Sequence, residues 1–169
     1  MVTVLFVLCV ATGSAVAGAN DDGLTVLRVG TGGIGGTYFP VGSLIAQSIS
    51  EHRDDDGRVQ AQGVKGLLAV VQTSNGSIAN VNGMRRGHLD AALAQSDVVY
   101  WSYHGMAVFG GQPRQGNLRA IAHLYPESLH LVARSNSGIA RVEDLRERRV
   151  SFDELGSGTI PNPQSPIHS

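Results

Sequence analysis

The sequence predicts an α/β domain built on a sheet of parallel strands. Short apolar, β-branched runs alternate along the chain with segments whose apolar residues recur at helical spacing. Glycine accounts for 22 of the 169 residues, well above its usual share of ~7%, which indicates loops where the backbone closely approaches another group. A content of 42% hydrophobic and 16% charged residues excludes a disordered chain, and the length suits one compact domain.

The first predicted unit is a strand, a glycine-rich loop and a helix. Leu24–Gly30 is a β-branched run that ends in glycine, which is typical of a strand. The loop 31–37 follows, and Pro40 suits the first turn of the next helix. One face of that helix is predicted to carry its apolar residues, Val41, Leu44, Ile45 and Ile49.

The second unit repeats this order. A strand is predicted within Val59–Thr73, with Leu67–Val71 as its apolar core. The turn 74–76 leads to Ser77, which can cap a helix running to about residue 86. Gly87 then predicts the end of that helix.

The third unit starts with Leu89–Ala94, a short buried strand, and continues through a loop at Gln95–Asp97. The helix after it is predicted to end at Gly105 and to carry Val98, Val99, Trp101 and Tyr103.

The remaining chain predicts strands at Leu118–Tyr125, Leu129–Arg134 and Arg149–Phe152, with a helical turn at Val142–Leu145. Residues 160–169 hold three prolines without periodicity and predict an unstructured tail.

The N-terminus resembles an export signal. Val2–Val10 is apolar, and small residues continue to Ala19, with cleavage patterns at residues 15–17 and 17–19. The apolar run is shorter than the ~20 residues that span a bilayer. Against an export signal, no Lys or Arg precedes Arg28. We therefore predict a signal peptide at 1–19 and a periplasmic location, and a buried N-terminal strand is the alternative.

Three predicted loops share one topological position, because each joins a strand end to a helix start. Ligands of open α/β sheets bind at that edge, where helix N-termini offer free N–H groups to anions. The loops contain no Lys or Arg, so a bound carboxylate would be held by dipoles and hydroxyl groups. The polar candidates are Thr37, Ser74, Asn75, Ser77, Gln95 and Ser96, with Tyr38, Phe39 and Tyr100 as walls.

Several other functions lack their signatures. A net charge of −1 gives no basic footprint for nucleic acid, and the single Cys9 excludes a disulfide framework. The histidines show no metal-ligand spacing, so neither a metal nor a cofactor is expected. Gly30–Gly35 fits G-x-G-x-x-G, but the acidic residues 54–56 precede the second strand instead of ending it. No enzyme signature is found, so we predict a non-enzyme, and an exported enzyme or nucleotide-binding domain using the loop Gly30–Gly36 stays open as the alternative.

Five separated motifs together resemble the TAXI-type solute-binding subunits of TRAP transporters. These motifs are VGTGGIGGTYFPVG at 29–42, TSNGSIANV at 73–81, QSDVVY at 95–100, LRAIAHLYPESLHLVAR at 118–134 and VSFDELGSGT at 150–159. The resemblance covers roughly residues 24–159.

This resemblance implies a class II periplasmic binding protein of the clam-shell type. Such a receptor captures a small organic acid or amino acid, of the glutamate or dicarboxylate class, for membrane permease subunits. It also implies that Tyr125, Pro126 and Glu127 lie near the hinge. The positions implied to face the ligand are Gly33, Thr37, Tyr38, Ser74, Asn75, Ser77, Gln95, Asp97 and Tyr100, with Ser157, Gly158 and Thr159 on the opposite lobe.

The domain arrangement that follows is a first lobe at 24–134 and the start of a second lobe at 135–159. Proteins of this type are about twice as long, so the resemblance predicts a truncated receptor with an aberrant tail at 160–169. Ligand pockets normally bury most of the ligand surface. We therefore expect the chain as given to bind weakly or not at all. An interaction module that feeds a sensor protein is a further alternative to transport.

Overall fold

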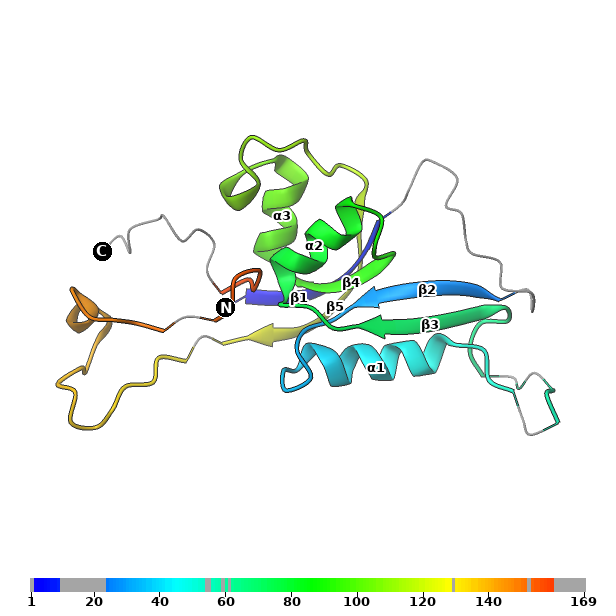
Figure 1. The fold of residues 1–169 in the computed structure, drawn as a ribbon, viewed down its shortest axis with the longest axis horizontal. Helices are drawn as coiled ribbons and strands as arrows, with labels where there is room; N and C mark the ends of the chain where they lie inside the picture. Colours follow the sequence, from blue (N-terminus) through cyan, green and yellow to red (C-terminus); the bar gives the residue numbers. More distant parts are fainter. Residues whose placement is uncertain are drawn as a thin grey trace.

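The computed structural model describes residues 2–9, 24–53, 56–58, 60, 62–128, 130–151 and 153–159. Its centre is one five-stranded sheet with the spatial order β3-β2-β4-β1-β5. α1 covers one face of the sheet, and α2 and α3 cover the other (Figure 1). The result is a mixed α/β single-sheet domain, which is compatible with one lobe of a periplasmic-binding-protein-like protein.

The first predicted unit is confirmed. β2 (Thr25–Gly30) pairs in parallel with β3 (Leu67–Gln72), and α1 (Tyr38–Ile49) connects them with Pro40 in its first turn. Tyr38, Gly42 and Ala46 are buried on the sheet side of α1. The predicted apolar face was wrong at Leu44, which is 64% exposed. The small side chains of Gly42 and Ala46, rather than bulky ones, let the helix approach the strands.

α2 (Ser77–Arg85) begins and ends close to its predicted bounds, but its start differs in one detail. Gly76 is the N-cap, and no side chain caps this helix. Ser77 was expected to be the cap, whereas its hydroxyl is turned into the domain, where it contacts Tyr38 and Gln95. Gly87 has φ +72°, and its N–H donates to the carbonyl of Met84, as a helix-ending glycine should.

β4 (Ala91–Gln95) runs directly into α3 (Ser96–His104), with Gln95 as the N-cap, so the predicted loop at 95–97 does not form. All five residues of β4 are buried, and the strand is parallel to β2. Gly105 ends α3 in the left-handed region, at φ +68°, as predicted. Tyr103 lies on α3 as predicted and is 42% exposed.

The 3-10 turn η1 (Ala107–Phe109) and then β5 (Leu118–Glu127) follow. Leu129–Arg134 and Arg149–Phe152 were predicted to be strands, but residues 130–134 and 149–151 form none. Leu131 and Val132 are 51% and 87% exposed. A strand needs a neighbouring strand with which to form backbone hydrogen bonds. Among the described residues, no strand pairs with residues 130–134 or with residues 149–151. The predicted helical turn is confirmed as the 3-10 turn η2 (Val142–Leu145).

β1 (Val2–Cys9) occupies the position between β4 and β5 and is antiparallel to both. This is the alternative interpretation of the N-terminal run, a buried strand. Residues 10–19 and 160–169 of the predicted signal peptide and tail lie outside the described residues. Cleavage and export of the chain therefore stay predictions.

Two apolar clusters lie on opposite faces of the sheet, and β1 contributes residues to both. Val7 packs with Met84, Val98 and Phe109 on the side of α2 and α3. Val4 and Phe6 pack with residues of β4 and α1 on the other side. No helix among the described residues is both long and apolar enough to cross a membrane.

Candidate ligand-binding site

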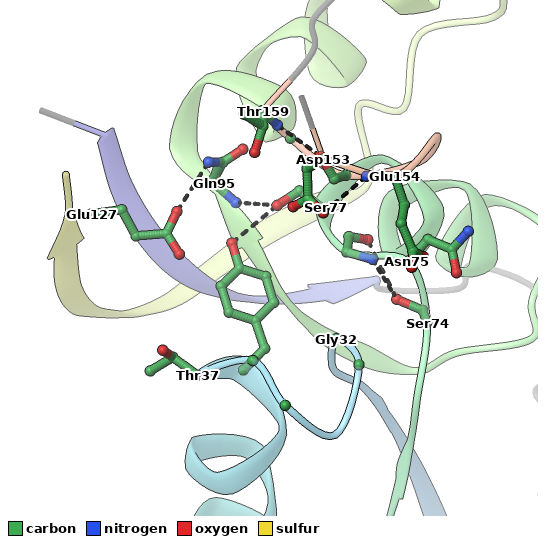
Figure 2. A pocket seen from close by; sticks show the side chains of 17 residues that line it. Gly32, Thr37, Ser74, Asn75, Ser77, Gln95, Glu127, Asp153, Glu154 and Thr159 are labelled. Carbon is green, nitrogen blue, oxygen red and sulfur yellow. Dashed lines mark hydrogen bonds between the residues drawn. The ribbon is translucent and has the colours of Figure 1, made fainter. Parts of the chain in front are cut away.

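A cavity of about 370 Å³ lies where β2, β3, β4 and β5 end. This volume is at the lower end of the ~300–1,000 Å³ of small-molecule sites. The three helices that start at this edge contribute residues from their N-termini (Figure 2). The cavity is lined by Gly32, Gly33, Gly35, Gly36, Thr37, Tyr38, Ser74, Asn75, Gly76, Ser77, Gln95, Glu127, Asp153, Glu154, Ser157, Gly158 and Thr159.

The loop between β2 and α1 presents bare backbone to the cavity. Thr31 anchors the loop, because its N–H and its hydroxyl both donate to the carbonyl of Gln72, at 2.8 and 3.0 Å. A Cβ built on Gly33 or Gly35 would meet nothing within 4 Å. Neither glycine has a positive φ. Their lack of side chains therefore serves to leave the backbone accessible rather than to allow an unusual conformation.

Asn80 connects this loop to the neighbouring strand ends. Its side chain is fully buried, and its amide donates to the carbonyls of Thr31 and Leu93, both at 2.8 Å. The hydroxyl of Ser74 lies 2.7 Å from Asn80 Oδ1 and 2.7 Å from the carbonyl of Thr31. This hydrogen-bond network fixes the positions of the ends of β2, β3 and β4 relative to one another beneath the cavity.

Ser77 forms the junction at the cavity wall. Its oxygen is 3.0 Å from the hydroxyl of Tyr38 and accepts the N–H of Gln95 at 3.1 Å. Burial raises the pKa of Tyr38 well above its usual value, so its hydroxyl stays neutral at pH 7 and can exchange hydrogen bonds with Ser77. The first residue of α1, the first residue of α2 and the last residue of β4 therefore meet at one point.

Glu127, the last residue of β5, brings a carboxylate to this junction. Its Oε2 accepts a hydrogen bond from Gln95 Nε2 at 2.9 Å (Figure 2). Tyr125 lies beside it, and burial, together with the charge of Glu127, raises the pKa of that tyrosine to about 12. This corner of the cavity is thus partly dehydrated and negatively charged.

Residues 153–159 close the side opposite the glycine loop. The N–H of Ala79 donates to the carbonyl of Gly156 at 2.9 Å, and Asn75 Nδ2 donates to the carbonyl of Leu155 at 3.0 Å. A Cβ on Gly158 would overlap Oε1 of Gln95, so the backbone of this segment approaches the Gln95 side chain closely. Asp153 and Glu154 reach the cavity rim from this segment.

The structure brings ten of the twelve residues expected at the ligand to this cavity. Gly33, Thr37, Tyr38, Ser74, Asn75, Ser77, Gln95, Ser157, Gly158 and Thr159 line it. Asp97 and Tyr100 are not among its lining residues. Asp97 accepts the N–H of Val98 within the first turn of α3, and Tyr100 is 56% exposed with its ring against His104. Of the other suggested residues, Phe39 and Ser96 do not line the cavity either.

Sequence reasoning missed the three acidic residues of the cavity. Glu127 was expected near the hinge, and Asp153 and Glu154 were given no role in ligand binding. The available signal for Glu127 was its position at the end of a predicted strand, the same topological position that pointed to the three loops.

The nucleotide alternative does not gain support from this geometry. Dinucleotide sites place a carboxylate at the end of the second parallel strand, next to the glycine loop. Here β3 ends at Gln72, followed by Thr73 and Ser74, and Asp56 precedes the strand. Within the described part of the chain, no group of three or more His, Cys, Asp or Glu side chains is arranged to hold a metal ion.

Comparison with known protein families gives a match that spans most of the chain. The model of the NMT1-like family matches residues 29–165, which include the loops and strand ends that build the cavity. The chain belongs to the NMT1-like family. This is a periplasmic-binding-protein-like family, so membership indicates a solute-binding role and a small-molecule ligand. It is a family of binding proteins rather than of enzymes.

Proposed function

We propose that this member of the NMT1-like family is the periplasmic solute-binding receptor of a TAXI-type TRAP transporter. It captures a small organic acid or amino acid, of the glutamate or dicarboxylate class, and delivers it to membrane permease subunits. The observation that carries the proposal is the cavity at the strand ends, where bare glycine backbone meets the starts of three helices. The match to a binding-protein family supports it.

The chemistry of the cavity fits capture rather than turnover. Helix N-termini and exposed N–H groups bind carboxylates without changing them. α1 and α2 carry no acidic residue in their first turns, so their positive ends are not neutralised locally. The hydroxyl of Thr37 makes no capping hydrogen bond with α1, and this leaves it available to a ligand.

A leucine at Gly33 tests whether this cavity is the binding site. Since a Cβ at Gly33 meets nothing within 4 Å, Gly33→Leu should fold normally while its side chain fills the cavity. Gly116→Leu is the matched control, because Gly116 is also surrounded by open space and does not line the cavity.

The readout is a titration of the ¹⁵N-labelled chain with glutamate, glutamine, 2-oxoglutarate and succinate, followed by amide chemical shifts. We expect weak binding, because the described residues leave one side of the cavity open to solvent. Shifts should gather at residues 32–37 and 74–77, persist in Gly116→Leu and disappear in Gly33→Leu. Binding that Gly33→Leu leaves intact would place the site elsewhere.

The transport assignment needs its own experiment. Vesicles that contain TRAP permease subunits should take up the bound solute under a sodium or proton gradient only when this chain is added. Uptake should fail with Gly33→Leu and succeed with Gly116→Leu. If uptake does not depend on the chain, the TRAP assignment is wrong even when solute binding is observed.

A further inference from the structure

The cavity has an unbalanced set of charges. Three of its lining residues are carboxylates, namely Glu127, Asp153 and Glu154, and none of the described residues that line it is Lys, Arg or His. Asp153 and Glu154 are exposed and therefore screened by solvent, whereas Glu127 is half-buried. A ligand with only negative groups would meet the carboxylate of Glu127 without a compensating cation, which is unfavourable. A ligand that is positively charged at one end would avoid this cost, because its positive group supplies the compensating charge.

Gln95 shows where that positive end belongs. Its Nε2 donates to Glu127 Oε2, and this fixes the orientation of the amide, since the reversed orientation would set an oxygen against a carboxylate. Oε1 then faces Gly158, is buried, and has no hydrogen-bond partner among the described residues. Gln95 as a whole is only 7% exposed. A buried acceptor without a donor is unusual in a folded protein. An N–H group of a ligand would satisfy it.

The same residues recur in a second hollow that adjoins the first. Thr37, Gln95, Glu127 and Thr159 line both, and Tyr125 lines the second. The hydroxyl oxygen of Tyr125 is also buried without a hydrogen-bond partner in the described structure. This corner therefore holds a carboxylate and two oxygen atoms that can accept hydrogen bonds, which is the complement of a group with several N–H donors.

We propose that the solute carries a protonated amino group, which the carboxylate of Glu127 and Oε1 of Gln95 hold. Its carboxylate lies toward the glycine loop and the starts of α1 and α2, so the two ends of a zwitterion match the two ends of the cavity. The site thus selects amino acids and rejects acids of the same carbon skeleton that lack the amine. This inference rests on the proposed function.

The test compares acids that differ only in the amine. The pairs are glutamate and 2-oxoglutarate, alanine and pyruvate, and leucine and 4-methyl-2-oxopentanoate, each titrated into the full chain and followed by amide chemical shifts. In the pair that binds, the amino acid should bind on the order of tenfold or more tightly than the oxo acid. Glu127→Gln should remove most of this preference by weakening only the amino acid.

Two further variants test the role of Gln95 and control for the loss of charge. Gln95→Met removes the unpaired acceptor and should also weaken the amino acid selectively. Glu143→Gln removes the same charge from the exposed turn η2, away from the cavity, and should leave both affinities unchanged. Unfolding midpoints of all variants show whether each is folded.

The possible outcomes separate the two proposals. Equal affinity for both members of the binding pairs, or an amino acid affinity that Glu127→Gln does not lower, would overturn the amine subsite while solute binding stands. No binding of any amino acid or oxo acid would contradict the proposed function itself.

Discussion

Val7 tests whether the N-terminal run is a strand of this sheet in solution. The side chain is fully buried and packs in the cluster between the sheet, α2 and α3. Val7→Ala removes two methyl groups from that cluster and leaves the backbone of β1 unchanged. If β1 forms as described, this substitution destabilises the domain.

The expected loss follows from burial. Each buried methyl group contributes about 0.8 kcal/mol by transfer from water, which gives about 1.6 kcal/mol for the two. The cavity left in a packed interior adds about 1 kcal/mol. We expect the free energy of unfolding to fall by about 2–3 kcal/mol, a large share of the 5–15 kcal/mol of an ordinary domain.

Urea unfolding followed by the fluorescence of Trp101 measures this loss. Trp101 is the single tryptophan, and it packs against the same cluster as Val7. A loss of 2–3 kcal/mol should lower the urea midpoint by about 1–2 M at a typical dependence on denaturant. Val70→Ala on β3 is the matched control, because Val70 is 40% exposed and should lose less than about 1 kcal/mol.

Equal midpoints for Val7→Ala and Val70→Ala would refute the reasoning. Such a result would mean that residues 2–9 are not packed between β4 and β5 in the folded protein. The prediction of an N-terminal signal peptide would then gain support over the buried strand.

Three further predictions concern contacts within the domain. Arg28 donates hydrogen bonds to both carboxylate oxygens of Asp90, at 2.9 and 2.8 Å, and this holds the pKa of Asp90 below its usual range. The lowered pKa stabilises the fold above about pH 4. Because the two side chains stay 38% and 29% exposed, Asp90→Asn should cost about 1 kcal/mol at pH 7. The difference from the parent should shrink as pH falls below 4 through the folded-state pKa, and a constant difference in acid unfolding curves would contradict this. Asn80→Ala should cost about 3 kcal/mol in urea unfolding, since it leaves the carbonyl of Leu93 without its side-chain donor. Gly42→Ala should lower the unfolding midpoint, because its Cβ would overlap Thr31 Cγ2. Adding Thr31→Ser removes that methyl group and should restore most of the loss, and a double variant no more stable than Gly42→Ala would show that the overlap is not the cause.

The central strands and helices could be predicted from the sequence because their patterns are local. The β-branched run that ends in Gly30 located β2, the apolar run Leu67–Val71 located β3, and the run Leu118–Tyr125 located β5. The stops at Gly87 and Gly105 ended α2 and α3 as expected. The two strands predicted after residue 128 failed because strand formation depends on a partner, and composition carries no information about whether a partner is present.

The cavity shows the same division between local and long-range information. Its glycines, hydroxyl groups and amides could be predicted because each follows a strand directly. The position of Glu127 at a strand end was the one available signal, and it did not suffice, because the place of Glu127 at the cavity depends on β5 lying two places from β4 in the sheet. β5 lies there because β1 pairs with both strands and separates them. Neither the pairing nor the order of the strands can be predicted from a local sequence pattern.

β1 itself explains why one sequence supports two interpretations. A strand with both faces buried is apolar throughout, since Val7 faces one cluster while Val4 and Phe6 face the other. The apolar core of a signal peptide has the same composition for a different reason, which is insertion into a membrane during export. A segment that is cleaved off after export cannot also serve as β1, whereas a segment that stays attached can. Cleavage near Ala17 or Ala19 would remove the strand that joins β4 to β5 and expose both as unpaired edges. The loss of three buried side chains alone, at ~1.5–3 kcal/mol each, would then approach the whole stability of an ordinary domain. The mass of the mature N-terminus therefore decides whether β1 belongs to the mature domain.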